Sequence, residues 1–446
     1  MTEQGVRWTA DQVLALAPDA ASRKAGGRLG TAGPWSGSGS GKESVWGLCK
    51  GSGSKPYQTV VDLTGPAYKC SCPSRKFPCK HALGLLLLWA ADDGSVPVRA
   101  EPPEWAEQWL TGRRDHAEDK RTEGGGSAPA ADPEAARRRA ERRAERVTAG
   151  ATELEQRLAD LLRGGLAAAE QAGYGLWEET AARMVDAQAP GLAARVRDLG
   201  AIPASGAGWP ARLLEECALL HLLDQGWLRR EALPEPLAAT VRSRLGLPAS
   251  AEGAPERDRW LVLAQYDTAD TKLTTRRIWL YGTASHRTRL LLSYGPAGRA
   301  PELSLPVGLA LDAELSAYPG AGQLRAALGE RFGAPVPAGL RPPGTSTAEA
   351  LARYGTALRE DPWLESVPVT LEQVVPVPDG EQWQLADADE DAALPLTRAA
   401  RSRPGLWRLL ALSGGAPVTV FGECGHRGFT PLTAWPEGDG EAVPLC

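Results

Sequence analysis

The stretch "CSCPSRKFPCKH", residues 70–81, places four metal-binding side chains within one short segment, in the spacing C-x-C-x6-C-x-H. The whole chain of 446 residues has only seven cysteines and five histidines. Cys70 and Cys72 lie two positions apart on a predicted strand, and alternate residues of a strand point to the same face. The proline-bracketed "PSRKFP" then turns the chain back, so that Cys79 and His81 arrive where the apolar "HALGLLLLWAA" begins a helix. The sequence therefore predicts that these four side chains converge.

Three thiolates and one imidazole form a complete tetrahedral ligand set for zinc. Soft sulfur ligands favour zinc over magnesium or calcium. Because the protein fills all four positions, no position stays open for a catalytic water. We therefore predict one structural Zn²⁺ held by Cys70, Cys72, Cys79 and His81.

Other uses of the thiols fit this spacing less well. A Cys-x-Cys pair is poorly placed to form a disulfide with itself, and redox pairs are more often Cys-x-x-Cys. An iron–sulfur cluster is a further alternative, although imidazole ligation is rarer there. Cys49, on a predicted strand upstream, is interpreted as a packing residue because four ligands are already present.

This pattern, with C-x-C on a strand and C-x-H opening a helix, resembles the SWIM-type zinc finger. The resemblance covers residues 1–110, and the longer run from Trp46 to Trp89 is similar to the version in bacterial SWIM zinc finger proteins. The composition, rich in alanine, glycine and arginine, suits a high-GC bacterium such as an actinomycete. The resemblance implies a ββα finger that binds DNA or protein, since SWIM domains occur in chromatin-remodelling ATPases, transposases and ubiquitin-ligase-type proteins.

Positive charge is concentrated around the finger, although the chain as a whole carries a net charge of −5. Residues 42–81 hold seven basic and two acidic residues, and six of the nine lysines of the chain. One interpretation is a solvated loop surface, and the other is a patch for DNA or an acidic protein surface. The candidate contacts are Arg75 and Lys76 at the hairpin tip, Lys80 between two ligands, and Lys69.

The rest of the pattern predicts an α+β chain with an N-terminal ββα finger, a central α-helical region and a C-terminal mixed, mainly antiparallel β region. Residues 1–110 form the finger domain, with its core at about 57–92. A capping box, Thr9 to Gln12, opens a short helix there, and "GPWSGSGSGK" reads as a glycine-serine loop. Residues 151–250 are helical, beginning at a second capping box, Thr152 to Glu155. Residues 255–446 form one mixed α/β domain, in which "GQLRAALGERFG" is a predicted helix.

Residues 111–150 have a different composition, with many charged residues and almost no large apolar residue. We predict a flexible linker at 111–133, followed by a solvated helix through "EAARRRAERRAERV". The six arginines of this helix leave two alternatives open, which are contact with nucleic acid and partial pairing with the neighbouring glutamates.

No motif for catalysis stands out. "GSGSGK" fails the phosphate-loop pattern because Glu43 follows Lys42. Cys217 and His221 lie four apart on one helix face, but their apolar surroundings indicate a buried thiol and a satisfied histidine. Cys424 and His426 have the C-x-H spacing of a finger but no accompanying C-x-C pair. We therefore predict a chain that is not an enzyme and has no catalytic residue.

The longest apolar run, residues 82–91, is about half of what a bilayer requires, and the N-terminus lacks a signal-peptide pattern. We expect a cytoplasmic protein with no membrane partner. The leading hypothesis is a zinc-binding interaction module for DNA or protein. The alternatives are a protein–protein adaptor in an ATPase-containing assembly, without DNA contact, and an enzyme with an unrecognised site in residues 255–446.

Overall fold

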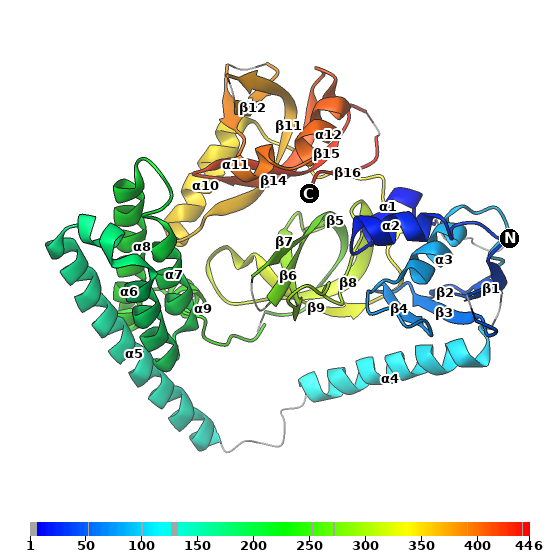
Figure 1. Ribbon diagram of the computed structural model, residues 1–446, viewed down its shortest axis with the longest axis horizontal. Coiled ribbons are helices and arrows are strands. Elements are labelled where there is room, and N and C mark those ends of the chain that lie inside the picture. The colour runs from blue at the N-terminus through cyan, green and yellow to red at the C-terminus, as the bar shows by residue number, and fades with distance from the viewer. Residues whose placement is uncertain are drawn as a thin grey trace.

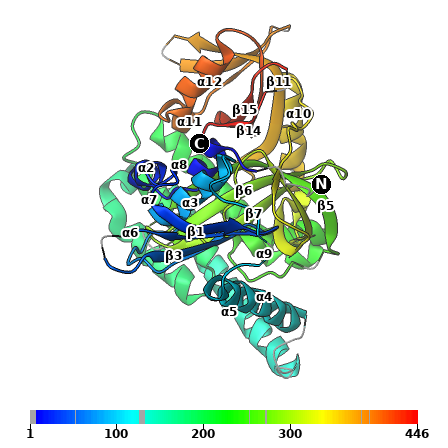
Figure 2. The ribbon, with the colours of Figure 1, turned by 90° about the vertical axis from the view of Figure 1, so that its right-hand side faces the viewer.

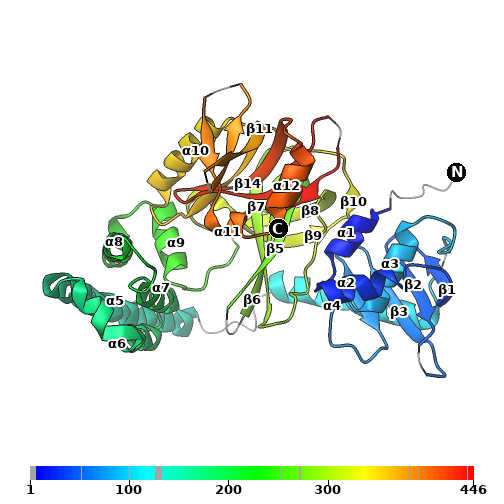
Figure 3. The same cartoon turned by 45° about the horizontal axis from the view of Figure 1, so that its top comes forward.

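The computed structural model describes residues 7–446, apart from residues 52, 100, 126–132, 252, 271–272, 381, 390 and 439. Three regions follow one another along the chain: a finger domain (residues 7–125), a helical bundle (residues 133–244) and two β-sheets (residues 256–444) (Figure 1). The finger domain and the helical bundle lie on opposite sides of the two sheets (Figure 3). The chain is α+β, as the sequence predicts.

The finger domain consists of α1 (Ala10–Ala15), α2 (Ala20–Gly27), β1 (Trp35–Ser40), β2 (Ser44–Cys49), β3 (Tyr57–Asp62), β4 (Ala67–Cys70), α3 (Lys80–Ala90) and α4 (Glu104–Gly125). Its strands form an antiparallel sheet in the order β1-β2-β3-β4. The capping box at Thr9 and Gln12 is present and opens α1. The predicted ββα unit is β3, β4 and α3, and β1 and β2 extend its sheet.

The sheet of the finger domain is covered on both faces (Figure 2). On one face lies α3, whose leucines are buried in a cluster with Trp8 and Val13. On the other face, Trp46 and Val60 pack against Ala106 and Leu110 of α4. Burying α3 in this way fixes the position of its N-terminus, where two of the predicted ligands lie.

The glycine-serine stretch predicted as a loop contains strand β1. Glycine and serine have low strand propensity, so this strand depends on its pairing with β2. In that pairing Gly39 lies opposite Trp46, and a Cβ on Gly39 would come within 2.8 Å of the indole. The glycine therefore lets the ring of Trp46 close over the strand, which sequence propensity does not show.

The helical bundle contains α5 (Pro133–Gly164), α6 (Ala167–Asp186), α7 (Pro190–Ala201), α8 (Trp209–Leu228), the short 3-10 helix η1 (Arg230–Ala232) and α9 (Glu235–Arg244). Leu154, Met184, Leu220 and Trp227 are among the residues of its buried core. The prediction that a helix begins at Thr152 is wrong. Helix α5 starts at Pro133, and the Thr152 hydroxyl donates inside it to the carbonyl oxygen of Thr148 at 2.8 Å.

The linker prediction at residues 111–133 is also wrong over much of its length. Residues 111–125 belong to α4, which begins at Glu104 and is anchored to the sheet by its first turns. Residues 126–132 lie outside the described residues. The low apolar content that suggested a linker is compatible with a helix whose described packing contacts lie in its first turns.

The C-terminal region holds two six-stranded sheets. The first has the order β10-β8-β5-β6-β7-β9, and the second β13-β12-β11-β14-β15-β16. Their strands are β5 (Glu256–Ala269), β6 (Leu273–Gly282), β7 (Thr288–Pro296), β8 (Leu309–Ala317), β9 (Arg325–Arg331), β10 (Val336–Pro337), β11 (Ser366–Asp379), β12 (Gln382–Asp387), β13 (Ala393–Pro395), β14 (Val418–Gly425), β15 (Gly428–Trp435) and β16 (Val443–Pro444). The connections between these strands contain one 3-10 helix and three α-helices: η2 (Ala321–Gln323), α10 (Thr347–Glu360), α11 (Arg398–Arg401) and α12 (Gly405–Ser413).

Both sheets are mainly antiparallel, as predicted, and the β7–β9 pair is parallel. A shared apolar cluster joins them, in which Leu261 and Leu263 of β5 meet Phe421 of β14 and Leu432 of β15. The helix predicted at residues 322–333 is wrong, because Arg325–Arg331 is strand β9 between β7 and β8. Tertiary pairing overrides the helical propensity of this segment.

The finger domain is attached to the first sheet. Trp8 Nε1 donates a hydrogen bond to the carbonyl oxygen of Pro335 at 2.9 Å, and Leu309 of β8 belongs to the core of the finger domain. The finger is therefore packed against the rest of the molecule and is not a separate module on a tether. Among the described helices, none has the length and apolar character needed to cross a bilayer.

Candidate metal centre

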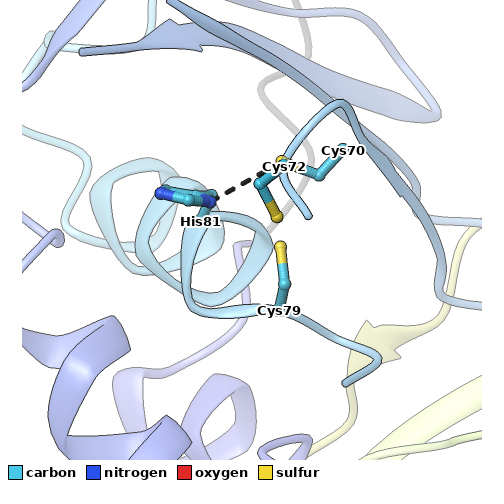
Figure 4. A group of neighbouring side chains, drawn as sticks. All are labelled: Cys70, Cys72, Cys79 and His81. Atoms are coloured by element: carbon cyan, nitrogen blue, oxygen red, sulfur yellow. Dashed lines mark hydrogen bonds between the residues drawn. The ribbon is translucent and has the colours of Figure 1, made fainter. Parts of the chain in front are cut away.

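The four predicted ligands come together where β4 ends and α3 begins (Figure 4). Cys70 is the last residue of β4, Cys79 is the N-cap of α3, and His81 lies in the first turn of that helix. The ligand atoms of these residues and Cys72 all lie within 4.8 Å of one another. Cys70 Sγ lies 3.7 Å from His81 Nδ1. Three sulfurs and one imidazole nitrogen around a common centre fit one structural zinc ion.

The path of the chain differs from the prediction in one respect. Strand β4 ends at Cys70, so Cys70 and Cys72 do not share a strand. Cys72 instead belongs to the irregular segment that leads to Cys79. The four side chains still converge, because α3 packs on the same face of the sheet as Cys70.

Neighbouring side chains hold two of the ligands. Thr59 lies directly opposite Cys70 in the β3–β4 pairing, is fully buried, and its Oγ1 lies 3.3 Å from Cys70 Sγ. The ring of Tyr57 lies against the His81 imidazole, with centroids 4.8 Å apart. Such contacts behind the ligands orient them for the metal and tune their basicity.

Burial is uneven across the centre. Cys79 and His81 are 3 % and 5 % exposed, whereas Cys70 and Cys72 are half-buried. The pKa of the Cys70 thiol falls to about 3, because Cys79 donates a hydrogen bond to its sulfur and His81 and Thr59 add to this effect. The pKa of Cys79 rises in return, since it holds the shared proton and is buried. Crowded thiols of this kind are stabilised as thiolates by a cation between them.

Cys49 is buried close to the centre but is not one of the ligand group found among the described residues. Burial raises the pKa of its thiol, and the nearby Cys70 and Cys72 raise it further. Its Sγ donates weakly to the Lys50 carbonyl oxygen at 3.8 Å. A neutral, buried thiol agrees with its interpretation as a packing residue.

The four candidate partner contacts do not form one patch. Lys69 lies opposite Val60, which packs toward α4, so Lys69 is on the other face of the sheet from the metal ligands. Arg75 is exposed on the loop between Cys72 and Cys79. Lys76 Nζ is ion-paired with Asp19 Oδ2 at 2.7 Å, and Lys80 is exposed at the start of α3.

A groove of about 590 Å³ lies between α2 and the metal centre. Three lysines line it: Lys50 directly after β2, Lys76 from the loop and Lys80 from α3. Its other lining residues include Leu29, Tyr57, Ser74, Cys72 and His81. The groove therefore combines cationic groups with an aromatic and aliphatic surface next to the zinc ligands.

Sequence reasoning did not assign roles to Asp19, Lys50, Tyr57 or Thr59. The sequence contains a signal for Lys50, because this residue lies in the lysine-rich stretch at 42–81. The other three need tertiary information. Thr59 contacts Cys70 only through strand register, and Asp19 reaches Lys76 from a separate helix.

The remaining cysteine–histidine pairs do not form metal sites among the described residues. Cys217 is buried in the bundle core, and His221 Nδ1 lies 2.8 Å from Glu155 Oε1. His426 Nδ1 pairs with the Tyr354 hydroxyl at 3.2 Å, while Cys424 is buried in the core of the second sheet.

Comparison with known families finds matches in two segments of the chain. Residues 60–90 match the SWIM zinc finger, and the matched segment covers the second half of β3, all of β4, the four ligands and α3. Residues 142–245 match the SWIM-associated four-helix bundle domain, which covers most of α5 and the helices through α9. No curated protein and no solved structure matches the chain.

Proposed function

We propose, because residues 60–90 match the SWIM zinc finger, that the zinc-supported groove of this chain binds the phosphate backbone of DNA. The zinc-binding finger with a single Cys₃His centre is the established part of this account. DNA as the ligand is the proposed part. The observation that carries it is the set of lysines from three separate segments that line one groove beside the metal ligands.

The charges in the groove are not all equivalent. With zinc bound, three thiolates and one divalent ion give the centre one negative charge, and Asp19 neutralises Lys76. Lys50 and Lys80 have no carboxylate within ion-pair distance in the part of the chain that is described. They are therefore the cations available to phosphate, and Tyr57 offers a ring surface to a sugar or an unpaired base.

The test is a fluorescence anisotropy titration of the full chain with single- and double-stranded DNA at several salt concentrations. We expect affinity to fall linearly in log salt, with a slope that counts phosphate contacts. The variant Lys50→Ala/Lys80→Ala should keep one zinc and lose affinity, and its slope on duplex DNA should be shallower by up to about 1.8.

The matched control is Lys42→Ala/Lys69→Ala, which removes the same charge from the same domain outside the groove. It should bind DNA as the unmodified chain does. Equal losses in both variants would contradict the groove and leave only a diffuse charge effect. No binding at low salt would contradict DNA as the ligand.

A second candidate function is a protein–protein adaptor, in an assembly that contains an ATPase or in another one. Trp407 on α12 favours it, because this side chain is 67 % exposed and large exposed aromatic residues often anchor interfaces. Under this alternative, Trp407→Ala abolishes partner binding and leaves the zinc content unchanged. Both candidates are non-catalytic, so sustained nucleotide or ester hydrolysis by the purified chain would contradict both.

A further inference from the structure

The N-terminal part of α5 extends beyond the helices that it packs against (Figures 1 and 2). Ala144 and Val147 mark the point where α5 joins the core of the helical bundle. Before that point almost every side chain described in α5 is exposed. This projecting part contains six arginines between Arg137 and Arg146.

These arginines are not spread evenly around the helix. At 100° per residue, five of them fall within an arc of about 140° that contains no glutamate. These five define the arginine face of α5: Arg138, Arg139, Arg142, Arg143 and Arg146. Arg137 lies on the opposite side of the helix, where it pairs with Glu141 at 2.9 Å.

The arginines of this face differ in whether they have a side-chain hydrogen-bond or ion-pair partner. Arg138 is paired with Glu134 at 3.6 Å, and Arg143 Nε donates to Gln188 Oε1 at 3.2 Å. Arg139, Arg142 and Arg146 have no carboxylate within ion-pair distance among the described residues. Arg146 Nε reaches only the backbone oxygen of Arg142, at 3.4 Å. Partial self-pairing of this helix is therefore present, but it leaves three guanidinium groups in one row.

The apolar residues of the projecting part are small. Ala135, Ala136 and Ala140 are the apolar side chains of the projecting part, which offers no aromatic or leucine anchor. Stable protein interfaces depend on such anchors. A row of guanidinium groups on a projecting helix segment without a large apolar side chain is instead suited to a ligand bound through charge, and guanidinium groups match phosphate oxygens.

We propose that the arginine face of α5 is a second nucleic-acid contact, in which Arg139, Arg142 and Arg146 bind the phosphate backbone of DNA. The row rises about 10 Å along the helix, and this length of duplex carries about six phosphate charges. The inference rests on the proposed function, because it extends the same ligand to a second surface of the chain.

The experiment compares variants of the full chain on duplex DNA across a salt series. Arg139→Gln/Arg142→Gln/Arg146→Gln should keep its zinc and its helix content, lose affinity, and have a salt slope shallower by up to about 2.7. The control Arg137→Gln/Arg163→Gln/Arg183→Gln removes the same charge at arginines that are paired with carboxylates. It should change the slope little.

The outcomes separate this inference from the proposed function. If only Lys50→Ala/Lys80→Ala weakens binding, the groove stands and the arginine face is overturned. If only the arginine-face variant weakens binding, the arginine face stands and the groove fails. Binding of polyglutamate through this face, without binding of DNA, would overturn the inference in favour of an acidic protein.

Discussion

Thr59, which lies opposite Cys70 on the neighbouring strand, supports the thiolate form of this ligand. The hydroxyl of Thr59 is fully buried and lies 3.3 Å from Cys70 Sγ. A hydroxyl in this position donates to the thiolate and lowers the cost of burying its charge. The C-x-C-x6-C-x-H spacing identifies the four ligands, but it carries no information on this support, which depends on the β3–β4 register.

Thr59→Val should therefore weaken zinc binding by about 10-fold, since loss of a contact behind a ligand typically costs 10–100-fold in metal affinity. Valine keeps the volume of the side chain and removes only the hydroxyl. The measurement is competition with a chromogenic chelator. Ser71→Ala is the control, because it removes a neighbouring hydroxyl whose hydrogen bond is to the Gln58 backbone N–H. Equal zinc affinities in Thr59→Val and the unmodified chain would contradict the role of the hydroxyl.

At the scale of single elements, the approach of α2 to α3 positions the helix that carries His81. Gly26 of α2 faces α3, and a Cβ there would lie 2.7 Å from Leu83 Cβ. The neighbouring Gly27 has no atom within 4 Å of such a Cβ. The two glycines are adjacent in the sequence, so only the packing of the helices separates their roles.

Gly26→Ala should destabilise the finger domain by about 1–3 kcal/mol, because the added methyl group overpacks the contact with Leu83. Gly27→Ala should be neutral or stabilise it by up to about 1 kcal/mol, because alanine favours the helix. Urea unfolding followed by tryptophan fluorescence measures both. Two variants of equal stability would show that α2 can move away from α3 without cost.

Within the helical bundle, Asp224 of α8 is an unusual buried group. The residue is fully buried, and neither of its carboxylate oxygens has a hydrogen-bond partner among the described residues. Burial and the nearby Glu155 raise its pKa to about 9. Glu155 is in turn held by His221 and by Gln225, whose Nε2 donates to Glu155 Oε2 at 2.8 Å.

This pKa makes the stability of the bundle depend on pH. The pKa of an aspartate in an unfolded chain is about 3.9, so between about pH 4 and pH 9 the folded state keeps a proton that the unfolded state has lost. The contribution to stability is complete below the unfolded pKa and falls as the pH rises, by up to about 1.4 kcal/mol per pH unit. Asp224→Asn should flatten this fall in urea unfolding between about pH 6 and pH 8. Asp160→Asn, at an exposed position of the same bundle, should retain it, and parallel curves for all three proteins would contradict the argument.

Across the whole molecule, the sequence predicted features that depend on local chemistry. The four ligands, the ββα unit and the bundle helices follow from ligand spacing and apolar periodicity. The errors arise where a distant partner decides the structure. The residues of β9 have helical propensity, yet they form a strand because they pair with β7 and β8. The glycine-rich β1 likewise forms a strand because it pairs with β2.

The candidate groove shows the same limit. Lys50, Lys76 and Lys80 come from three segments, and Lys69, which the sequence grouped with them, lies on the opposite face of the sheet. Asp19 neutralises Lys76 from a helix far away in the sequence. The cluster of charge in the sequence therefore located the region of the candidate groove, whereas the choice of residues that line it required the packed structure.

The central claim is that one zinc ion is held by Cys70, Cys72, Cys79 and His81. X-ray absorption at the zinc edge of the intact chain, combined with metal analysis, tests it most directly. We predict one zinc per chain, with three sulfurs at about 2.3 Å and one nitrogen at about 2.0 Å, and loss of the metal in Cys72→Ser. A zinc-free chain, or a zinc shell containing oxygen and fewer than three sulfurs, would contradict the claim.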